Sequence, residues 1–361
     1  MRKTLILTVR LCLLCVQLAA ATMYEQVVLY PSVDQHGDSL MLSGKVSVPT
    51  HQPPKGIILL AHFTIGADKE APSNSTLYEQ KQLGEDFILV MPDYIGYGVT
   101  ADRFPPYLDG ALTARNCVDM LPAAQHLLDS LEVGIGLDSL YVMGFSQGGA
   151  AALWTLKHIE DHYGDRYHVK CCFCGSGPYD VAATYDVGVA ENKSALPMAV
   201  PLLVMGTSAA YDLNLSRGHF FTRRMNKVFE PLIASKKHKI LELYLRMPRH
   251  RLDYWLTPVA RDKSDPETQG LYEGLLRSSI VHFPVDDSAV GADSICPDWT
   301  PQAPLYVFHS YEDEIVPFVN AGHLQRCMSG LPGITYDFGN FGGHLQSAYT
   351  FTRRVKEKLL P

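Results

Sequence analysis

The most informative part of the chain reads Leu140-Tyr141-Val142-Met143-Gly144-Phe145-Ser146-Gln147-Gly148-Gly149. An apolar run typical of a buried strand leads into a serine set between glycines, and a helix-compatible sequence follows. Such a turn holds the serine in a strained conformation between the strand and the helix. Gly144 and Gly148 leave room for the close backbone approach that this turn needs. The pattern predicts that Ser146 is a nucleophile, and that the amide of Gln147 faces the oxyanion formed when it attacks a carbonyl.

A nucleophilic serine needs a base and an orienting acid, and both follow later in the chain. Asp313 comes after the apolar run 305–308, and His344 comes after the run 334–338 and a glycine-rich loop. A histidine in a loop can place its ring between a carboxylate and the serine. We therefore expect Asp313 to be the acid and His344 the base. The alternatives for the acid are carboxylates in comparable loops: Glu312, Glu314 and Asp180.

The rest of the chain alternates short apolar runs with helical stretches, which is typical of a mostly parallel α/β sheet. Residues 26–30 and 40–48, joined by a turn-rich segment, predict an antiparallel hairpin at the start. The predicted buried strands are 56–62, 87–92, 139–145, 169–175, 304–309 and 334–338. The predicted helices are 113–131, 147–163, 319–329 and 345–359.

One long segment breaks this alternation. Roughly 120 residues separate Gly175 from Pro304, with a helical middle at 220–244 and a loop-rich end that carries Asp286, Asp287 and Cys296. A structureless connection of this length is rare inside a compact domain. We expect a helical cap inserted at about 184–300, over the face of the sheet where function is usually carried.

The first 21 residues have the layout of a secretory signal peptide. A basic start, Met1-Arg2-Lys3, precedes an apolar stretch from Leu5 to Leu18 and then small alanines. A membrane anchor is the alternative, but the apolar stretch is short for a spanning helix and Arg10 interrupts it. The expected mature chain is 22–361, secreted or periplasmic, with no membrane span.

Composition narrows the classes of function. The chain is 47% hydrophobic and 19% charged, which fits a globular protein with a sizeable core. Its formal charge of −7 and the lack of a long Lys/Arg run exclude nucleic acid as an expected partner. Of the eight cysteines, two lie in the expected signal peptide, and the rest are too few for a disulfide scaffold. Cys296 and Cys327 are plausible partners, although pairing is left open by the sequence.

Two patterns could pass for metal sites. Cys171-Cys172-Phe173-Cys174 contains a C-x-x-C but lies in an apolar run, without a second ligand pair to complete a tetrahedral site. His158 and His162 have the spacing of zinc ligands, but Ile159 stands where the catalytic glutamate would be. We interpret the cysteines as core residues and the histidines as surface residues, and we expect no metal or organic cofactor.

The order of these motifs resembles the α/β-hydrolase superfamily, and more narrowly its secreted lipases and carboxylesterases with an inserted cap. The matching landmarks are Leu60-Ala61-His62 after the third strand, Pro92-Asp93-Tyr94-Ile95-Gly96-Tyr97-Gly98 after the fourth, the serine turn, Asp313 after the seventh and Gly343-His344 after the eighth. The resemblance implies that the loop after the third strand supplies a second oxyanion amide. There the family often has His-Gly, whereas this chain has His62-Phe63-Thr64. The choice between Phe63 and Thr64 stays open, with Thr64 favoured.

The resemblance also implies roles around the site. Asp93 is expected to be structural, and Tyr94, Tyr97 and Phe63 are candidates for contact with the substrate. The expected activity is hydrolysis of a small-molecule or lipid carboxylic ester through an acyl-enzyme. A peptidase or an acyltransferase would use the same triad, and a binding protein could retain the scaffold without turnover. The oligomeric state and the acyl specificity stay open.

Overall fold

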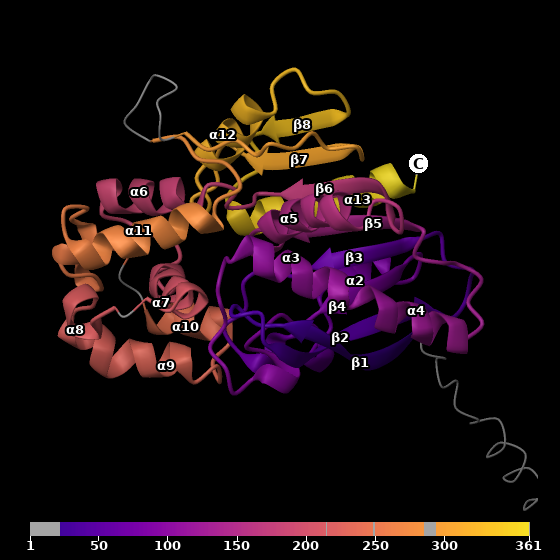
Figure 1. The fold of residues 1–361 in the computed structure, drawn as a ribbon, viewed down its shortest axis with the longest axis horizontal. Helices are drawn as coiled ribbons and strands as arrows, with labels where there is room; N and C mark the ends of the chain where they lie inside the picture. The colour runs from indigo at the N-terminus through magenta and orange to yellow at the C-terminus, as the bar shows by residue number, and fades with distance from the viewer. Residues whose placement is uncertain (1–21, 214, 248–249, 285–293, 361) are drawn as a thin grey trace, which may run out of the picture.

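The computed structural model describes residues 22–213, 215–247, 250–284 and 294–360. The expected signal peptide, and Asp286 and Asp287, lie outside the described residues. Figure 1 shows a central twisted sheet with helices on both faces and a group of helices beyond one end of the strands.

The sheet has eight strands in the order β1-β2-β4-β3-β5-β6-β7-β8. The strands are β1 Met23–Val33, β2 Ser39–Pro49, β3 Ile57–Ala61, β4 Ile88–Pro92, β5 Ser139–Phe145, β6 His168–Gly175, β7 Leu305–Ser310 and β8 Ile334–Gly339. β1 and β2 form the predicted antiparallel hairpin, and β2 pairs antiparallel with β4. From β4 to β8 every pairing is parallel, so the predicted mostly parallel sheet is confirmed.

The helices of the sheet domain cover its two faces. They are α2 Tyr78–Leu83, α3 Gly110–Asp119, α4 Leu121–Ser130, α5 Gln147–His162, α12 Val319–Cys327 and α13 His344–Leu359. Alternate residues of each strand point to opposite faces. Leu59 and Val142 face the core under α3, α4, α5 and α12. Leu60 and Phe308 face the core under α2 and α13.

The single helix predicted over 113–131 is wrong, because the chain forms two helices here. α3 ends at Asp119, and α4 begins at Leu121 with Pro122 in its first turn. Proline lacks the amide that a continuous helix would need, and its ring clashes with the carbonyl four residues earlier. Pro122 therefore stands at the start of a new helix.

Between β6 and β7 lies a largely helical insertion. Its helices are α6 Val181–Glu191, α7 Ala199–Tyr211, α8 Arg217–Phe220, a π-helical turn Met225–Phe229, α9 Glu230–Ala234, α10 Ile240–Arg246 and α11 Pro266–Ser278. The insertion also contains short 3-10 turns at Leu252–Tyr254 and Val259–Arg261. Other 3-10 turns, in the sheet domain, are Asp68–Glu70, Pro72–Asn74 and Gly98–Thr100. The insertion has its own apolar core, in which Trp255 is fully buried and packs on Phe229. The aromatic side chain of Trp255 therefore belongs to this small core.

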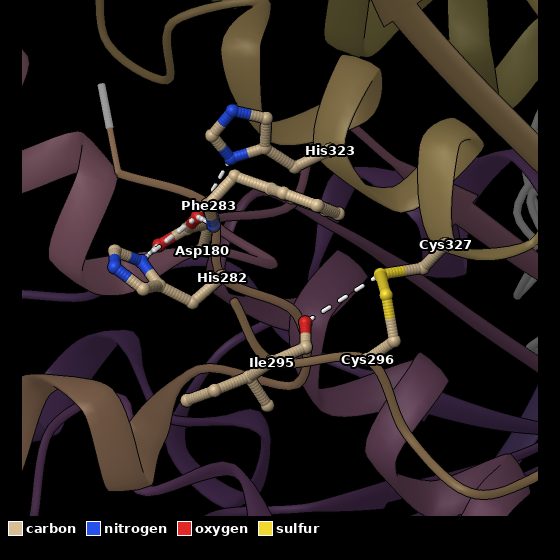
Figure 2. Close-up of a disulfide and its surroundings, with 7 residues drawn as sticks. All are labelled: Asp180, His282, Phe283, Ile295, Cys296, His323 and Cys327. Carbon is tan, nitrogen blue, oxygen red and sulfur yellow. Dashed lines mark hydrogen bonds and ion pairs between the residues drawn. A yellow bond between two sulfur atoms is a disulfide. The ribbon is translucent and has the colours of Figure 1, made fainter. Parts of the chain in front are cut away.

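The insertion starts and ends at one buried carboxylate, Asp180 (Figure 2). Asp180 accepts hydrogen bonds from the Ala183 amide at the start of α6 and from the Phe283 amide after α11, at 2.8 and 3.1 Å. It also accepts bonds from Nδ1 of His282 at 3.0 Å and Nδ1 of His323 in α12 at 2.7 Å. Burial raises the pKa of Asp180, but the bonds from the two histidines outweigh it and hold the pKa below its usual range. This ionised carboxylate joins both ends of the insertion to the sheet domain.

A disulfide joins Cys296 and Cys327, with 5.4 Å between their Cα atoms. It links the segment that follows α11 to the end of α12, close to the Asp180 cluster (Figure 2). Cys171, Cys172 and Cys174 lie in β6, where the thiols of Cys172 and Cys174 are buried.

Candidate active site

Ser146 lies between β5 and α5 with φ 59° and ψ −126°, a conformation that a non-glycine residue rarely adopts. Its amide donates to the Gly175 carbonyl at 2.8 Å. A Cβ on Gly144 would lie 2.1 Å from the Gly148 carbonyl oxygen, and one on Gly148 would lie 2.1 Å from the Ala61 oxygen. Only glycine fits at either position, so the strand–turn–helix expected around Ser146 is present with its close backbone contacts.

His344 bridges the two other predicted members of the triad. Its Nε2 is 2.9 Å from Oγ of Ser146, and its Nδ1 is 2.7 Å from Oδ2 of Asp313. Because an ionised carboxylate can only accept, Nδ1 donates to Asp313, and Nε2 of the neutral ring is free to accept the Ser146 proton. The side chains come from the ends of β5, β7 and β8, which meet at one edge of the parallel sheet. This arrangement can deprotonate a serine as it attacks a carbonyl.

The Asp313 carboxylate is held by the backbone as well as by the histidine. Its Oδ1 accepts from the amides of Ile315 at 3.1 Å and Val316 at 2.8 Å. Burial raises the pKa of Asp313, but the hydrogen bond from His344, the electrostatic effects of His344 and His309, and the Val316 amide outweigh it and hold the pKa below its ordinary value. Asp313 is therefore ionised at neutral pH.

The alternative acids contact other atoms. Glu312 accepts from the Gly342 amide at 2.9 Å, and Glu314 accepts from the His344 amide at 3.0 Å. Asp180 is engaged by the histidines at the base of the insertion. Of these four carboxylates, Asp313 is the one bonded to the His344 ring. Glu312 and Glu314 instead hold the backbone of the loop that carries His344, a role that the sequence did not indicate.

The loop after β3 lies directly against the serine turn. Ala61 is the register partner of Gly144, and a Cβ on Gly148 would also meet the His62 oxygen at 2.9 Å. Thr64 is buried in this loop, and its Oγ1 lies 2.7 Å from the hydroxyl of Tyr107. Helix α5 begins at Gln147, which directs its first amides toward the same edge of the sheet.

Tyr94 is built into the core. It has φ 67°, its ring stacks on His62 with 3.9 Å between centroids, and it is 4% exposed. This geometry favours a packing role, and direct contact between Tyr94 and substrate stays a prediction. Phe63 is partly exposed beside the site, and its role as a substrate contact also stays a prediction. Asp93 is fully buried and accepts from the Ser43 hydroxyl at 2.6 Å, which fits its expected structural role.

Tyr107 was not found by sequence reasoning. It lies in the loop that leads into α3, where no periodic pattern marks it. Only its position in three dimensions brings its hydroxyl to Thr64. Among the described residues, no three His, Cys, Asp or Glu side chains are grouped so that they could hold a metal ion.

Comparison with known proteins places this geometry in a known architecture. No family model matches the chain. The rice cell wall degrading esterase LipA of Xanthomonas oryzae superposes with a TM-score of 0.75 at 19% identity, over 94% of this chain and 89% of LipA. The chain has the α/β-hydrolase fold. Lipase A of Candida antarctica in its closed state also superposes on this hydrolase fold, with a TM-score of 0.65 at 16% identity over 95% of this chain and 80% of the lipase.

A relative in sequence points the same way. The secreted triacylglycerol lipase LIP5 of Malassezia furfur is 27% identical over 244 residues, which is 66% of this chain and 55% of the relative. The match therefore spans little more than half the length of that lipase. The resemblance to secreted lipases and carboxylesterases that the motif order indicated is confirmed.

Proposed function

We propose that the chain is a secreted serine hydrolase that cleaves carboxylic esters through an acyl-enzyme. The observation that supports this best is the bridge of His344 between Ser146 and Asp313, at 2.9 and 2.7 Å. The similarity to a secreted triacylglycerol lipase and to the LipA esterase supports an ester as the substrate. The substrate class we propose is a lipid ester or an acylated small molecule.

The proposed mechanism follows from the geometry. His344 accepts the Ser146 proton on Nε2 while the serine oxygen attacks the ester carbonyl. The amides of Gln147 and the Thr64 loop stabilise the oxyanion, and Asp313 stabilises the imidazolium. Collapse of the tetrahedral intermediate expels the alcohol, which takes its proton from His344. Water, deprotonated by His344, then attacks the acyl-enzyme and releases the acid.

We further propose that the insertion, about residues 184–300, acts as a cap over this site. Ser146 is only 8% exposed and His344 5%, so other parts of the chain cover most of the surface through which an ester would reach them. Figure 1 shows the insertion beyond the end of the sheet at which β6 ends. Gly206 of α7 packs against the Tyr107 backbone, which brings the insertion close to the Thr64 loop.

Secretion is proposed from residues 1–21 together with the disulfide. A structural disulfide persists in oxidising compartments and is rare in reducing ones. The Cys296–Cys327 bond is therefore in keeping with export. Among the described residues, none of the helices combines the length and the apolar character needed to cross a bilayer.

The decisive test is hydrolysis of p-nitrophenyl esters of increasing acyl length by wild type and Ser146→Ala. We expect turnover by the wild type and a loss of about 10⁴-fold or more in kcat for the variant. Ser130→Ala, an exposed serine of α4, is the control and should retain full activity. The chain-length optimum separates a short-chain esterase from a lipase. No turnover, in a folded protein whose Ser146 also fails to react with a fluorophosphonate, would show that the triad assignment is wrong and favour a binding protein.

Two further substrates separate the alternatives that share the triad. A peptide p-nitroanilide reports peptidase activity, and ester turnover with an added alcohol, followed by the new ester formed, reports acyl transfer. We expect ester hydrolysis to exceed both, because no described feature of the site binds a peptide amine or excludes water in favour of an alcohol.

A further inference from the structure

The hydroxyls of Thr64 and Tyr107 form an isolated buried pair. Their oxygens are 2.7 Å apart, and the two residues are 7% and 8% exposed. Among the described residues, the Tyr107 hydroxyl makes no other hydrogen bond, and neither does the Thr64 hydroxyl. Each hydroxyl has one proton, so one proton fills the bond between them and the other is free to point elsewhere.

The direction of this bond follows from acidity. A phenol is a stronger hydrogen-bond donor than an aliphatic alcohol, because its proton is far more acidic. Burial raises the pKa of Tyr107 to about 12, so the phenol keeps its proton at neutral pH. The favoured arrangement has Tyr107 donating to Oγ1 of Thr64, which leaves the Thr64 proton as the free one.

The loop that carries Thr64 lies at the same end of the sheet as the turn that carries Ser146. Ala61 pairs with Gly144, so the Thr64 loop and the Ser146 turn leave neighbouring parallel strands at the same end of the sheet. The carbonyls of Ala61 and His62 lie within 3 Å of a Cβ built on Gly148, so the Thr64 loop touches the first turn of α5. The loop that carries Thr64 therefore lies against the turn on which an oxyanion of the Ser146 adduct would form.

We propose that Tyr107 is a positioning residue for the oxyanion site: its hydroxyl donates to Oγ1 of Thr64 and turns the Thr64 proton toward the oxyanion. The Thr64 side chain then adds a donor to the backbone amides of the site. This inference rests on the proposed function, since Ser146 must generate the oxyanion.

The insertion fixes where the Tyr107 hydroxyl lies. Tyr107 packs in the apolar core of the insertion with residues such as Leu203 and Val204 of α7. A Cβ on Gly206 of α7 would lie 2.5 Å from the Tyr107 Cβ and 2.7 Å from its amide nitrogen. The backbones of α7 and Tyr107 are therefore in close contact. The Thr64 hydroxyl is aligned only while α7 packs against Tyr107. The insertion completes the oxyanion site in addition to covering it.

The test is a double-mutant cycle on kcat and KM with p-nitrophenyl butyrate. Tyr107→Phe keeps the ring and removes the hydroxyl, and we expect kcat to fall about 10- to 100-fold with KM changed less than about threefold, because the lost interaction acts in the transition state. Thr64→Val should lower kcat at least as much. The double variant should be no slower than Thr64→Val, since Tyr107 acts through the Thr64 hydroxyl.

Two further variants separate positioning from a general loss of structure. Thr64→Ser keeps the hydroxyl and should restore most of the activity lost in Thr64→Val. Tyr185→Phe is the matched control, because its buried hydroxyl donates to the Ala260 carbonyl within the insertion at 2.5 Å. We expect Tyr185→Phe to leave kcat near the wild-type value. The second-order rate of fluorophosphonate reaction with Ser146 should follow the same pattern as kcat.

Several outcomes would overturn the inference. It is wrong if Tyr107→Phe and Thr64→Val multiply their effects, if Tyr107→Phe raises KM with kcat unchanged, or if Tyr185→Phe is as slow as Tyr107→Phe. In each of these outcomes the wild type still hydrolyses the ester, so the proposed function would stand although the inference about Tyr107 would be wrong. That failure would appear as a wild type that neither turns over esters nor reacts with the fluorophosphonate, and the inference would fall with it.

Discussion

Consecutive carboxylates contact the loop that carries His344, and each contacts a different atom. Glu312 holds the Gly342 amide, Glu314 holds the His344 amide, and Asp313 bonds Nδ1 of the ring. The outer two fix where the loop runs, whereas Asp313 fixes how the ring is turned and which nitrogen carries the proton. The sequence placed all three acids near the histidine but left their roles open, since only the direction of each side chain separates them.

The residue-scale prediction compares Asp313→Asn with Glu312→Gln. An asparagine at 313 can present its NH₂ to Nδ1, which favours the tautomer with the proton on Nε2 and removes the base that Ser146 needs. We expect kcat to fall about 10⁴-fold. Glutamine at 312 keeps an oxygen for the Gly342 amide and should leave kcat close to wild type. Equal losses for the two variants, measured on the same p-nitrophenyl ester, would contradict the assignment of Asp313 as the orienting acid.

At the scale of elements, the serine turn depends on the close approach of β3, β5 and α5. Ser146 has a positive φ because the backbone turns sharply between β5 and α5, where α5 meets β3. The same close approach would leave only 2.1 Å between a Cβ on Gly148 and the Ala61 oxygen. Strain at Ser146 is tolerated because the surrounding backbone contacts leave it no alternative position.

Gly148→Ala should therefore destabilise the fold. The added methyl would meet the backbone oxygens of Ala61 and His62, which cannot rotate away as a side chain would, so we expect a loss of about 3 kcal/mol in the free energy of unfolding. Urea denaturation measures it. Gly270→Ala in α11 is the control, because a Cβ there meets nothing within 4 Å and should stabilise the helix by about 0.5–1 kcal/mol. A Gly148→Ala protein as stable as wild type would show that the turn can relax.

Strands β3, β4 and β7 were predictable because each is a short apolar run that is buried on both faces. Helices were less so. Pro122 divides the expected 113–131 helix into α3 and α4, and the periodic pattern concealed this division. The helices of the insertion pack on their own core around Trp255, so their bounds depend on contacts that no local pattern reveals. The pair of Thr64 and Tyr107 was out of reach for the same reason, since it joins two loops far apart in the sequence.

At the scale of the whole molecule, two features hold the insertion to the sheet domain. The Asp180 carboxylate joins the start and the end of the helical part of the insertion to α12 through His323, and the Cys296–Cys327 disulfide joins the segment after α11 to the end of α12. Both features contact α12, and α12 and α5 contribute side chains to the same apolar core on one face of the sheet.

Asp180→Asn should weaken the protein in a pH-dependent way. Asparagine offers fewer acceptor sites to the donors that Asp180 binds, so we expect a loss of about 3 kcal/mol in unfolding free energy at pH 7. Because the pKa of Asp180 in the folded protein lies below its unfolded value of about 3.9, its contribution is complete above that pH and is lost as the pH falls through the folded pKa. Urea midpoints at pH 7, 5 and 3 should show the gap between wild type and variant narrowing only at the lowest pH. Asp165→Asn, at an exposed site, should show no gap at any pH.

Removal of the disulfide should act mainly on the unfolded chain. The bond closes a loop with a sequence separation of 31 residues, for which loop-closure entropy gives a stabilisation of about 3–4 kcal/mol. We expect Cys296→Ser with Cys327→Ser to lower the unfolding free energy by about that amount while leaving kcat nearly unchanged below the melting temperature. A large loss of kcat in the folded variant would instead show that the disulfide positions the site.

The meeting of the two ends of the insertion at Asp180 has a consequence for how such a protein can be altered. The helices of the insertion begin after Tyr179 and end before Ile280, whose amide donates to the Tyr179 carbonyl at 3.0 Å. Because the two ends of this helical segment lie side by side, the segment does not change the order of the strands. A foreign helical segment joined at the same two positions would meet the same hydrogen bonds at Tyr179 and Asp180. Substrate preference could then be exchanged by grafting, provided that the graft carries its own contact for Tyr107.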